Sequence, residues 1–206
     1  VLNFLALLGW NSGTEQEIFS LDELIEKFSL DQISKSGARF DFEKAKWFNT
    51  QYIQSSSPEH IQNCINEFYN LHNIELNEEQ LLNIYSLYKD RVQLITDFYT
   101  NGAYLVSNKL NYNSEFLEKK WNLHWLPKYQ LLSKTLLNVQ EWSKPNLEMI
   151  LKEFMESEQL KMGEVLPTLR VILSGIPTGP DIYAMLLALG KSEVVERLNL
   201  FLMRQS

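Results

Sequence analysis

Hydrophobic residues recur every three or four positions along most of the chain, the spacing that places them on one face of an α-helix. The clearest example begins after Ser57-Pro58, where one face would carry Ile61, Cys64, Ile65, Phe68 and Leu71. No segment shows the sustained alternation of apolar and polar residues that marks a half-buried strand. The pattern therefore predicts an all-α protein.

Several helical segments begin with a capping signal. Ser20 is followed three residues later by Glu23, and Asn77 is followed three residues later by Gln80. Both pairs fit the capping box, in which each side chain bonds to the backbone of the other residue. Asp41 stands before a further helical segment and can cap it in the same way.

Glycine and proline predict where the helical segments end. We expect a turn at Asn101-Gly102, a connection around Pro145 and a break at Gly163. Another helix should start after Gly179-Pro180 and end at Gly190. A weak seam near residues 73–77 divides the chain into two predicted helical subdomains, 1–75 and 76–206.

One arginine, Arg170, lies in the apolar run LPTLRVIL directly before a turn rich in glycine and proline. It could be a structural ion-pair partner of Glu164 or Glu193 at the edge of a core. It could also project from that core and read a planar ligand rich in hydrogen-bond acceptors, since a guanidinium offers five donors in a fixed fork. The residues alone favour the ion pair.

The composition limits which partners the chain can have. The 206 residues are 45% hydrophobic and 22% charged, with a net charge of −7 and a single cysteine. No apolar run approaches the length of a bilayer-spanning helix, so we expect that the chain neither spans nor binds a membrane. The spread-out acidic balance argues against non-specific nucleic-acid binding. The single cysteine excludes an internal disulfide and fits a reducing compartment such as the cytoplasm.

The chain lacks the usual motifs of catalysis. It has no GxxxxGK loop and no GxGxxG loop, and its three histidines lie far apart without a metal-ligand companion at short spacing. No nucleophile and base form a convincing pair. We therefore predict no catalytic residues and no metal site, and the residues alone indicate a helical recognition module.

Two stretches carry more specific motifs. The first has LALLGW at 5–10, the segment Phe19–Phe28, SGARFD at 36–41 and KWFN at 46–49, and the second has KMG at 161–163, SG at 174–175 and LGK at 189–191. Together they closely resemble the C-terminal, anticodon-binding half of bacterial glutamyl-tRNA synthetases, which are class I ligases. The segment 58–145 matches that family only in its helical texture.

This resemblance implies an all-α cage of two subdomains that holds the anticodon of glutamate tRNA, with glutamine tRNA as a further candidate partner. It also implies that the fold binding ATP and glutamate precedes Val1. The chain itself should then need no cofactor and be inactive, whereas the parent enzyme would use ATP with magnesium. We expect a cytoplasmic monomer.

The resemblance also assigns site residues. At the position of Arg170 the family has an arginine that reaches the anticodon loop, and the turn Gly179-Pro180-Asp181-Ile182 would lie against the splayed bases, with Ile182 packed on one of them. Many relatives have a proline two residues before this arginine, whereas here Pro167 precedes it by three.

Gln54 stands where some relatives carry an arginine near the third anticodon base. That base is cytosine in glutamate tRNA and guanine in glutamine tRNA. Arginine only donates and suits the acceptors of cytosine, whereas glutamine can donate or accept. Gln54 would therefore discriminate less strictly, unless it merely ends a helix.

The alternative function is an all-α protein-interaction module. Net charge and helicity suit that function equally well, and only the motif matches favour tRNA. A tRNA gel shift with and without an intact glutamate anticodon distinguishes the two.

Overall fold

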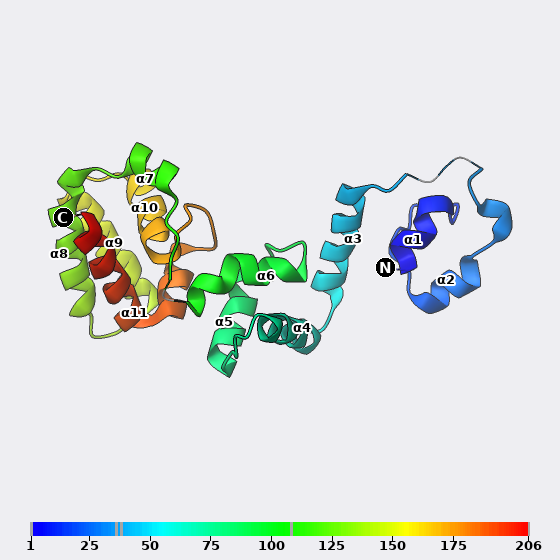
Figure 1. Cartoon of the computed structure of the whole chain (residues 1–206), viewed down its shortest axis with the longest axis horizontal. Helices are drawn as coiled ribbons and strands as arrows, with labels where there is room; N and C mark the ends of the chain where they lie inside the picture. Colours follow the sequence, from blue (N-terminus) through cyan, green and yellow to red (C-terminus); the bar gives the residue numbers. More distant parts are fainter. Residues whose placement is uncertain (1, 36, 38, 108, 206) are drawn as a thin grey trace. The chain divides into compact units, whose positions relative to one another are not determined.

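The computed structural model describes residues 2–35, 37, 39–107 and 109–205, so Ser36 and Ala38 of the SGARFD motif lie outside the described residues. Helices joined by loops make up the described chain (Figure 1). Its only extended pairing is an isolated antiparallel bridge between Trp10 and Ile33. The prediction of an all-α protein is confirmed.

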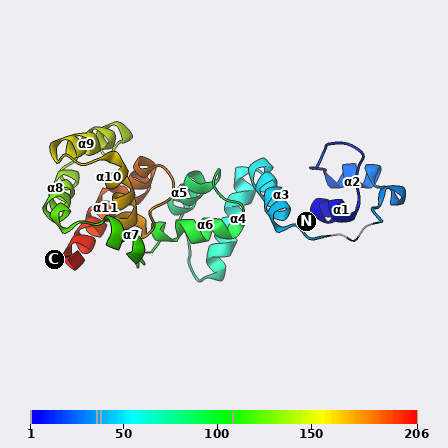
Figure 2. The ribbon, with the colours of Figure 1, turned by 90° about the horizontal axis from the view of Figure 1, so that it is seen from above.

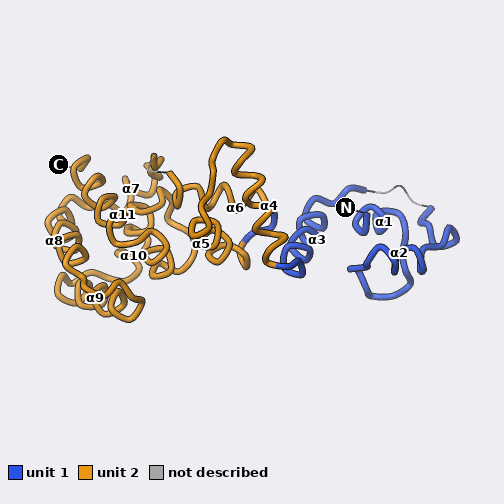
Figure 3. Tube along the Cα trace, turned by 90° about the horizontal axis from the view of Figure 1, so that it is seen from below, with its two compact units in different colours: residues 1–57, 92–94 blue, residues 58–91, 95–206 orange. Residues whose placement is uncertain are grey.

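The chain forms two compact units, residues 1–57 with 92–94 and residues 58–91 with 95–206 (Figure 3). The first unit contains α1 (Leu2–Gly9), α2 (Leu21–Lys27), the 3-10 turn η1 (Leu30–Gln32) and α3 (Phe42–Ser55). The second contains α4 (Pro58–Leu71), α5 (Glu78–Tyr88), α6 (Ile95–Gly102), η2 (Ala103–Leu105), α7 (Ser114–Lys120), η3 (Leu123–Trp125), α8 (Leu126–Leu137), α9 (Lys144–Ser157), α10 (Met162–Ser174) and α11 (Ile182–Gln205).

The seam predicted near residues 73–77 falls inside the second unit, in the loop between α4 and α5. Asn73 adopts a positive φ of 58° in this loop, a conformation that asparagine tolerates better than most residues. The division into subdomains 1–75 and 76–206 stays a prediction.

Local capping chemistry sets several helix starts as the sequence predicts. The Ser20 hydroxyl accepts from the Glu23 backbone N–H at 3.1 Å, and the Glu23 carboxylate accepts from the Ser20 N–H at 2.7 Å. Asn77 and Gln80 form the same reciprocal pair before α5. One carboxylate oxygen of Asp41 accepts two backbone N–H groups at the start of α3. Each cap satisfies donors that a helix start otherwise leaves without partners.

Each unit has its own core. Trp10, Phe19 and Leu24 form a buried cluster in the first unit. In the second unit α8, α9, α10 and α11 gather into one group, and α4, α5 and α6 gather into another (Figure 2). The first of these groups buries leucines and aromatic residues at helical spacing, among them Leu132, Leu136, Leu147, Leu151, Leu169, Leu198 and Phe201.

Three of the predicted break residues lie at the ends of helices, next to the connections. Asn101-Gly102 belongs to α6, where a Cβ on Gly102 would lie 3.1 Å from Tyr69 Oη and 3.2 Å from Ile84 Cγ2. Close packing against α4 and α5 therefore leaves little room for a side chain at this position. Pro145 and Gly163 are the second residues of α9 and α10, where the missing N–H of proline costs no intrahelical bond.

The predicted end at Gly190 is confirmed. Its φ of 74° and ψ of 162° interrupt the helical conformation within α11, so this element consists of two helices on either side of a kink. Glycine adopts this positive φ without the steric cost that a side chain would bring.

Candidate nucleic-acid interface

The turn at residues 175–181 joins α10 to α11 and is fixed at both ends. Gly175 ends α10 at a φ of 87°, and a Cβ there would lie 2.5 Å from the carbonyl oxygen of Asn111. The Gly175 carbonyl accepts from the Asn113 N–H at 2.8 Å. At the other end, the Asp181 carboxylate accepts from the Ala184 N–H at 3.2 Å. The position of the turn is thus set by glycine conformation and by a helix cap.

Arg170 extends from α10 along this turn and is half-buried. Its Nη2 donates to the carbonyl oxygen of Pro180 at 2.8 Å, and its Nη1 lies 3.4 Å from that of Pro177. Its Nε is buried and has no hydrogen-bond partner in the described part of the chain. The guanidinium therefore binds the backbone of the turn.

The predicted ion pair of Arg170 is wrong for both candidate partners. The Glu193 carboxylate pairs with Arg197 at 2.6 Å. The Glu164 carboxylate accepts from the Lys161 backbone N–H at 3.1 Å, at the start of α10. Arg170 instead donates hydrogen bonds to the carbonyl oxygens of Pro177 and Pro180, which lie within reach of its guanidinium.

Gly179 lies directly on the Arg170 side chain. Its φ is 155°, and a Cβ on it would lie 3.4 Å from Cδ and 3.5 Å from Nε of Arg170. Any other residue would adopt this backbone conformation only under strain. Glycine at this position lets the turn approach the arginine closely.

Pro180 and Ile182 are both buried, and the Ile182 side chain is only 2% exposed. Ile182 therefore packs in the core of the second unit and offers no surface to a base in this conformation. The sequence-based interpretation that it packs on a base does not fit this placement. Within the turn Thr178 and Asp181 are exposed, and Pro177 is half-buried.

Burial lowers the pKa of the Arg170 guanidinium, and the neighbouring Asp181 carboxylate opposes that shift. The positive charge of a second arginine, Arg91, also lowers this pKa, but less than burial does. Arg91 is exposed and follows α5 in a turn closed by its N–H on the Tyr88 carbonyl at 2.8 Å. The charges that act on Arg170 are therefore mixed, with Asp181 having a larger effect than Arg91. Sequence reasoning missed Arg91, because nothing in the loop around it indicates which residues it approaches.

Arg197 fixes the end of α10 from inside the second unit. Besides its pair with Glu193, it donates to the carbonyl oxygens of Leu173, Tyr104 and Ser107. A buried arginine is tolerated only when its donors have such partners. The carbonyl end of α10, next to the candidate turn, is thereby held to α11.

Gln54 lies in the last turn of α3 in the first unit and is exposed. The other predicted site residues, Arg170, Gly179, Pro180 and Ile182, all lie in the second unit. Pro167 lies inside α10, and the helix continues through it up to Arg170 and beyond.

Residues 43–202 match a family model described as an anticodon binding domain. The chain belongs to the anticodon-binding domain family. Among the described residues, no three histidine, cysteine or acidic side chains come together to hold a metal ion. None of the described helices has both the length and the apolar character of a membrane-spanning segment.

Curated relatives of this anticodon-binding domain are bacterial glutamate–tRNA ligases. That of Cytophaga hutchinsonii is 32% identical over 205 residues, covering 99% of this chain and 40% of the relative. That of Phocaeicola vulgatus is 34% identical over 199 residues, covering 97% of this chain and 39% of the relative. The chain thus spans about two fifths of the length of the relatives it matches.

Two solved structures are also similar. The glutamate tRNA ligase of Elizabethkingia meningosepticum, crystallised in complex with its amino acid, superposes with a TM-score of 0.88 at 31% identity. The match covers 100% of this chain and 41% of that one. The glutamate–tRNA synthetase of Elizabethkingia anophelis gives a TM-score of 0.82 at 31% identity, over 98% of this chain and 40% of that one.

Proposed function

We propose that this domain recognises the anticodon of glutamate tRNA as part of a longer ligase that attaches glutamate to that tRNA. The observation that carries the proposal is the pairing of Arg170 with its turn, in a chain whose similarity to glutamate–tRNA ligases covers nearly all its residues. Base recognition needs donors whose positions are fixed before the RNA arrives, since ordering them on binding would weaken the contact.

Arg170 can supply such donors. Two of its five N–H groups point to the carbonyl oxygens of Pro177 and Pro180, which leaves donors on the terminal nitrogens for a base edge or a phosphate. Gly179 lets the turn lie close to the side chain, and the hydrogen bond to Pro180 holds the guanidinium against the turn. Pro180 and Ile182 contribute from inside the fold, by anchoring the start of α11 beneath the turn.

Arg91 adds charge to this site. Its exposed guanidinium, whose charge acts on Arg170, would attract RNA phosphates without reading a base, and so would position the anticodon loop rather than select it. Gln54 would contact the third anticodon base, and its ability to donate or accept would let the ligase use glutamine tRNA as well as glutamate tRNA.

The chemistry of the ligase lies elsewhere in this proposal. ATP with magnesium and glutamate would bind the three fifths of the ligase that this chain does not match. The chain alone should then catalyse no glutamate-dependent exchange of pyrophosphate into ATP. We further propose that the ligase is a cytoplasmic monomer.

A gel shift with the 206-residue chain tests the proposal. One labelled glutamate tRNA carries its own anticodon, and a second differs only in its three anticodon bases. Recognition predicts that the first binds more tightly, by about 1–3 kcal/mol for each good contact to a base that is lost. Equal affinity for both tRNAs at several salt concentrations contradicts the proposal.

A further inference from the structure

A groove between α1 and α2 in the first unit is open to solvent and largely apolar. Its volume is about 440 Å³, and its lining residues are Leu2, Asn3, Phe19, Ser20, Leu21, Leu24 and Tyr52. Asn3 is used internally, since it donates to the Glu17 carbonyl and accepts from the Phe19 N–H and the Tyr52 hydroxyl. Apart from Ser20, the rest of the lining is mainly hydrocarbon that the described residues of this unit leave open.

Exposed leucine and isoleucine side chains extend this groove along both helices. Leu2 is 63% exposed, and Leu5 follows it by one turn of α1. Leu21 is 57% exposed, and Ile25, which follows it by one turn of α2, is 70% exposed. Residues three or four apart share one side of a helix, so each pair forms a stripe. We name the groove and these two stripes the α1–α2 face.

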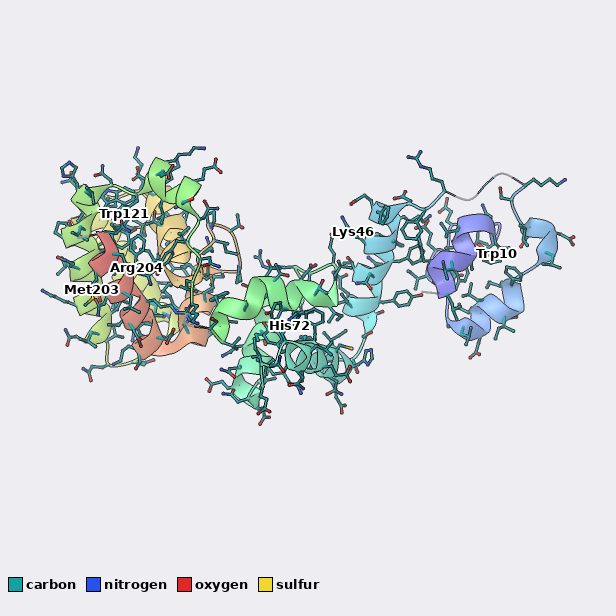
Figure 4. The ribbon with its side chains drawn as sticks, in the orientation of Figure 1. Trp10, Lys46, His72, Trp121, Met203 and Arg204 are labelled. Atoms are coloured by element: carbon teal, nitrogen blue, oxygen red, sulfur yellow. The ribbon has the colours of Figure 1, made fainter. Side chains whose placement is uncertain are left out.

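The core of the first unit lies on other residues of the same helices. Trp10, labelled in Figure 4, packs with Phe19 and Leu24, and these three side chains are buried. Single exposed leucines are ordinary on soluble proteins, whereas a contiguous apolar patch marks an interaction site. A unit of about 60 residues buries a small share of its surface, so a partner that covered this patch would add to its stability.

The match to the anticodon-binding family begins at residue 43, so α1 and α2 lie outside that domain. The similarity to whole glutamate–tRNA ligases nevertheless covers 97–99% of this chain and therefore includes both helices. These relatives have a further three fifths of their length that this chain does not match. The two helices thus accompany the anticodon-binding domain in the ligases without being part of it.

We propose that the α1–α2 face binds an apolar surface of that remaining part of the ligase and so attaches the anticodon-binding domain to it. This inference rests on the longer ligase of the proposed function. RNA is a poor occupant, because α2 carries Asp22, Glu23 and Glu26 against a single lysine, Lys27. A second copy of the chain is the other occupant that the experiment must exclude.

Hydrogen exchange measured on the 206-residue chain and on the longer ligase tests the proposal. Covering the face should make the amides of α2 exchange about tenfold more slowly in the longer ligase, because a covered helix opens less often. The amides of α9, in the second unit, serve as the internal control and should exchange equally in both proteins. Equal rates for α2 in the two proteins overturn the proposal.

A charged substitution sharpens the test. Ile25→Glu should lower the thermal midpoint of the longer ligase and restore fast exchange in α2, while leaving the midpoint of the 206-residue chain unchanged. Leu71→Glu, on α4, is the matched control, since Leu71 is 78% exposed and should change neither protein. An equal loss of stability in both proteins would mean that Ile25 supports its own unit, and the proposal would be wrong.

Two further measurements separate this inference from its alternatives. If sedimentation shows that the 206-residue chain forms a dimer that Ile25→Glu dissociates, and α2 exchanges equally in the longer ligase, then a second copy covers the face and the proposal fails. The tRNA gel shift tests the proposed anticodon contacts of Arg170 and Gln54, neither of which belongs to the α1–α2 face. If the gel shift shows no dependence on the anticodon while α2 exchanges slowly in the longer ligase, the proposed anticodon recognition is contradicted. The proposed contact of the α1–α2 face is then still supported.

Discussion

The Nη2 group of Arg170 donates to the carbonyl oxygen of Pro180, ten positions later in the sequence, at 2.8 Å. The same guanidinium reaches Pro177 through Nη1, and the backbone of Gly179 lies on its aliphatic part. A side chain that would contact RNA thus also supports the turn beside it. Recognition and local stability are therefore coupled in this residue, and its substitution should change both.

Arg170→Ala should lower the free energy of unfolding by about 1–3 kcal/mol, because two carbonyl oxygens lose donors worth about 0.5–1.5 kcal/mol each. It should also remove the preference for the intact anticodon in the gel shift. Arg170→Lys keeps the charge but loses the planar fork, so it should retain only part of both properties. Urea unfolding and the gel shift measure them side by side, and an unchanged unfolding free energy would contradict the turn-supporting role.

Gly179→Ala should destabilise the chain by about 1–3 kcal/mol, the cost of placing a side chain at its φ of 155°. Gly163→Ala is the matched control, because its Cβ would meet nothing within 4 Å and the position lies in a helix. That control should raise stability by about 0.4–1 kcal/mol. Urea midpoints that move in the same direction for both variants would refute the account.

Arg91→Ala should weaken tRNA binding to a similar degree for intact and altered anticodons. Loss of one phosphate contact should reduce the slope of log affinity against log salt by about one. Lys152→Ala, on α9, removes the same charge from an exposed helix surface and should leave the slope unchanged. Salt titrations of the gel shift give both slopes, and equal slopes for the two variants would exclude a contact by Arg91.

Gln54→Arg in the longer ligase should raise the ratio of glutamate tRNA to glutamine tRNA used. Arginine matches the acceptors of cytosine and would face the donors of guanine unpaired. Rates of glutamylation of the two tRNAs by the wild type and the variant give this ratio. If the wild type already rejects glutamine tRNA, or if arginine leaves the ratio unchanged, Gln54 is not a determinant.

Stability should fall in alkaline solution. Burial raises the pKa of Tyr69, Tyr88, Tyr104 and Tyr129 above the ordinary value of tyrosine. Their pKa is therefore higher in the folded than in the unfolded chain, so the stabilisation is complete below about pH 10 and is lost as the pH rises above it. Urea midpoints measured by circular dichroism, with tyrosinate absorbance followed in parallel, check this.

Tyr69→Phe provides the control for the alkaline prediction. The variant loses the hydrogen bond from Tyr69 Oη to the Phe98 carbonyl at 3.1 Å, so its stability at neutral pH should be lower. It also loses one titrating group, so its stability should fall less steeply above about pH 10. A slope identical to that of the wild type would show that Tyr69 does not contribute to the alkaline loss.

The amino-acid sequence by itself determined the helical fold class, the helix starts at Ser20, Asp41 and Asn77, and the family. A helix cap joins residues only two or three positions apart, and helical periodicity is likewise local, so both can be read along the chain. The motifs at the two ends of the chain pointed to the anticodon-binding part of glutamate–tRNA ligases, and the family match and the relatives agree with that.

Only the tertiary structure decided which residues meet. Gly102 has the local signature of a turn, yet it is the last residue of α6 and lies close to Tyr69 and Ile84. Ile182 and Ile25 are the same residue type in helices, but one is buried and the other is 70% exposed. Burial and hydrogen-bond partners depend on segments distant in sequence, and their approach is set by the packing of whole helices, which no local pattern records.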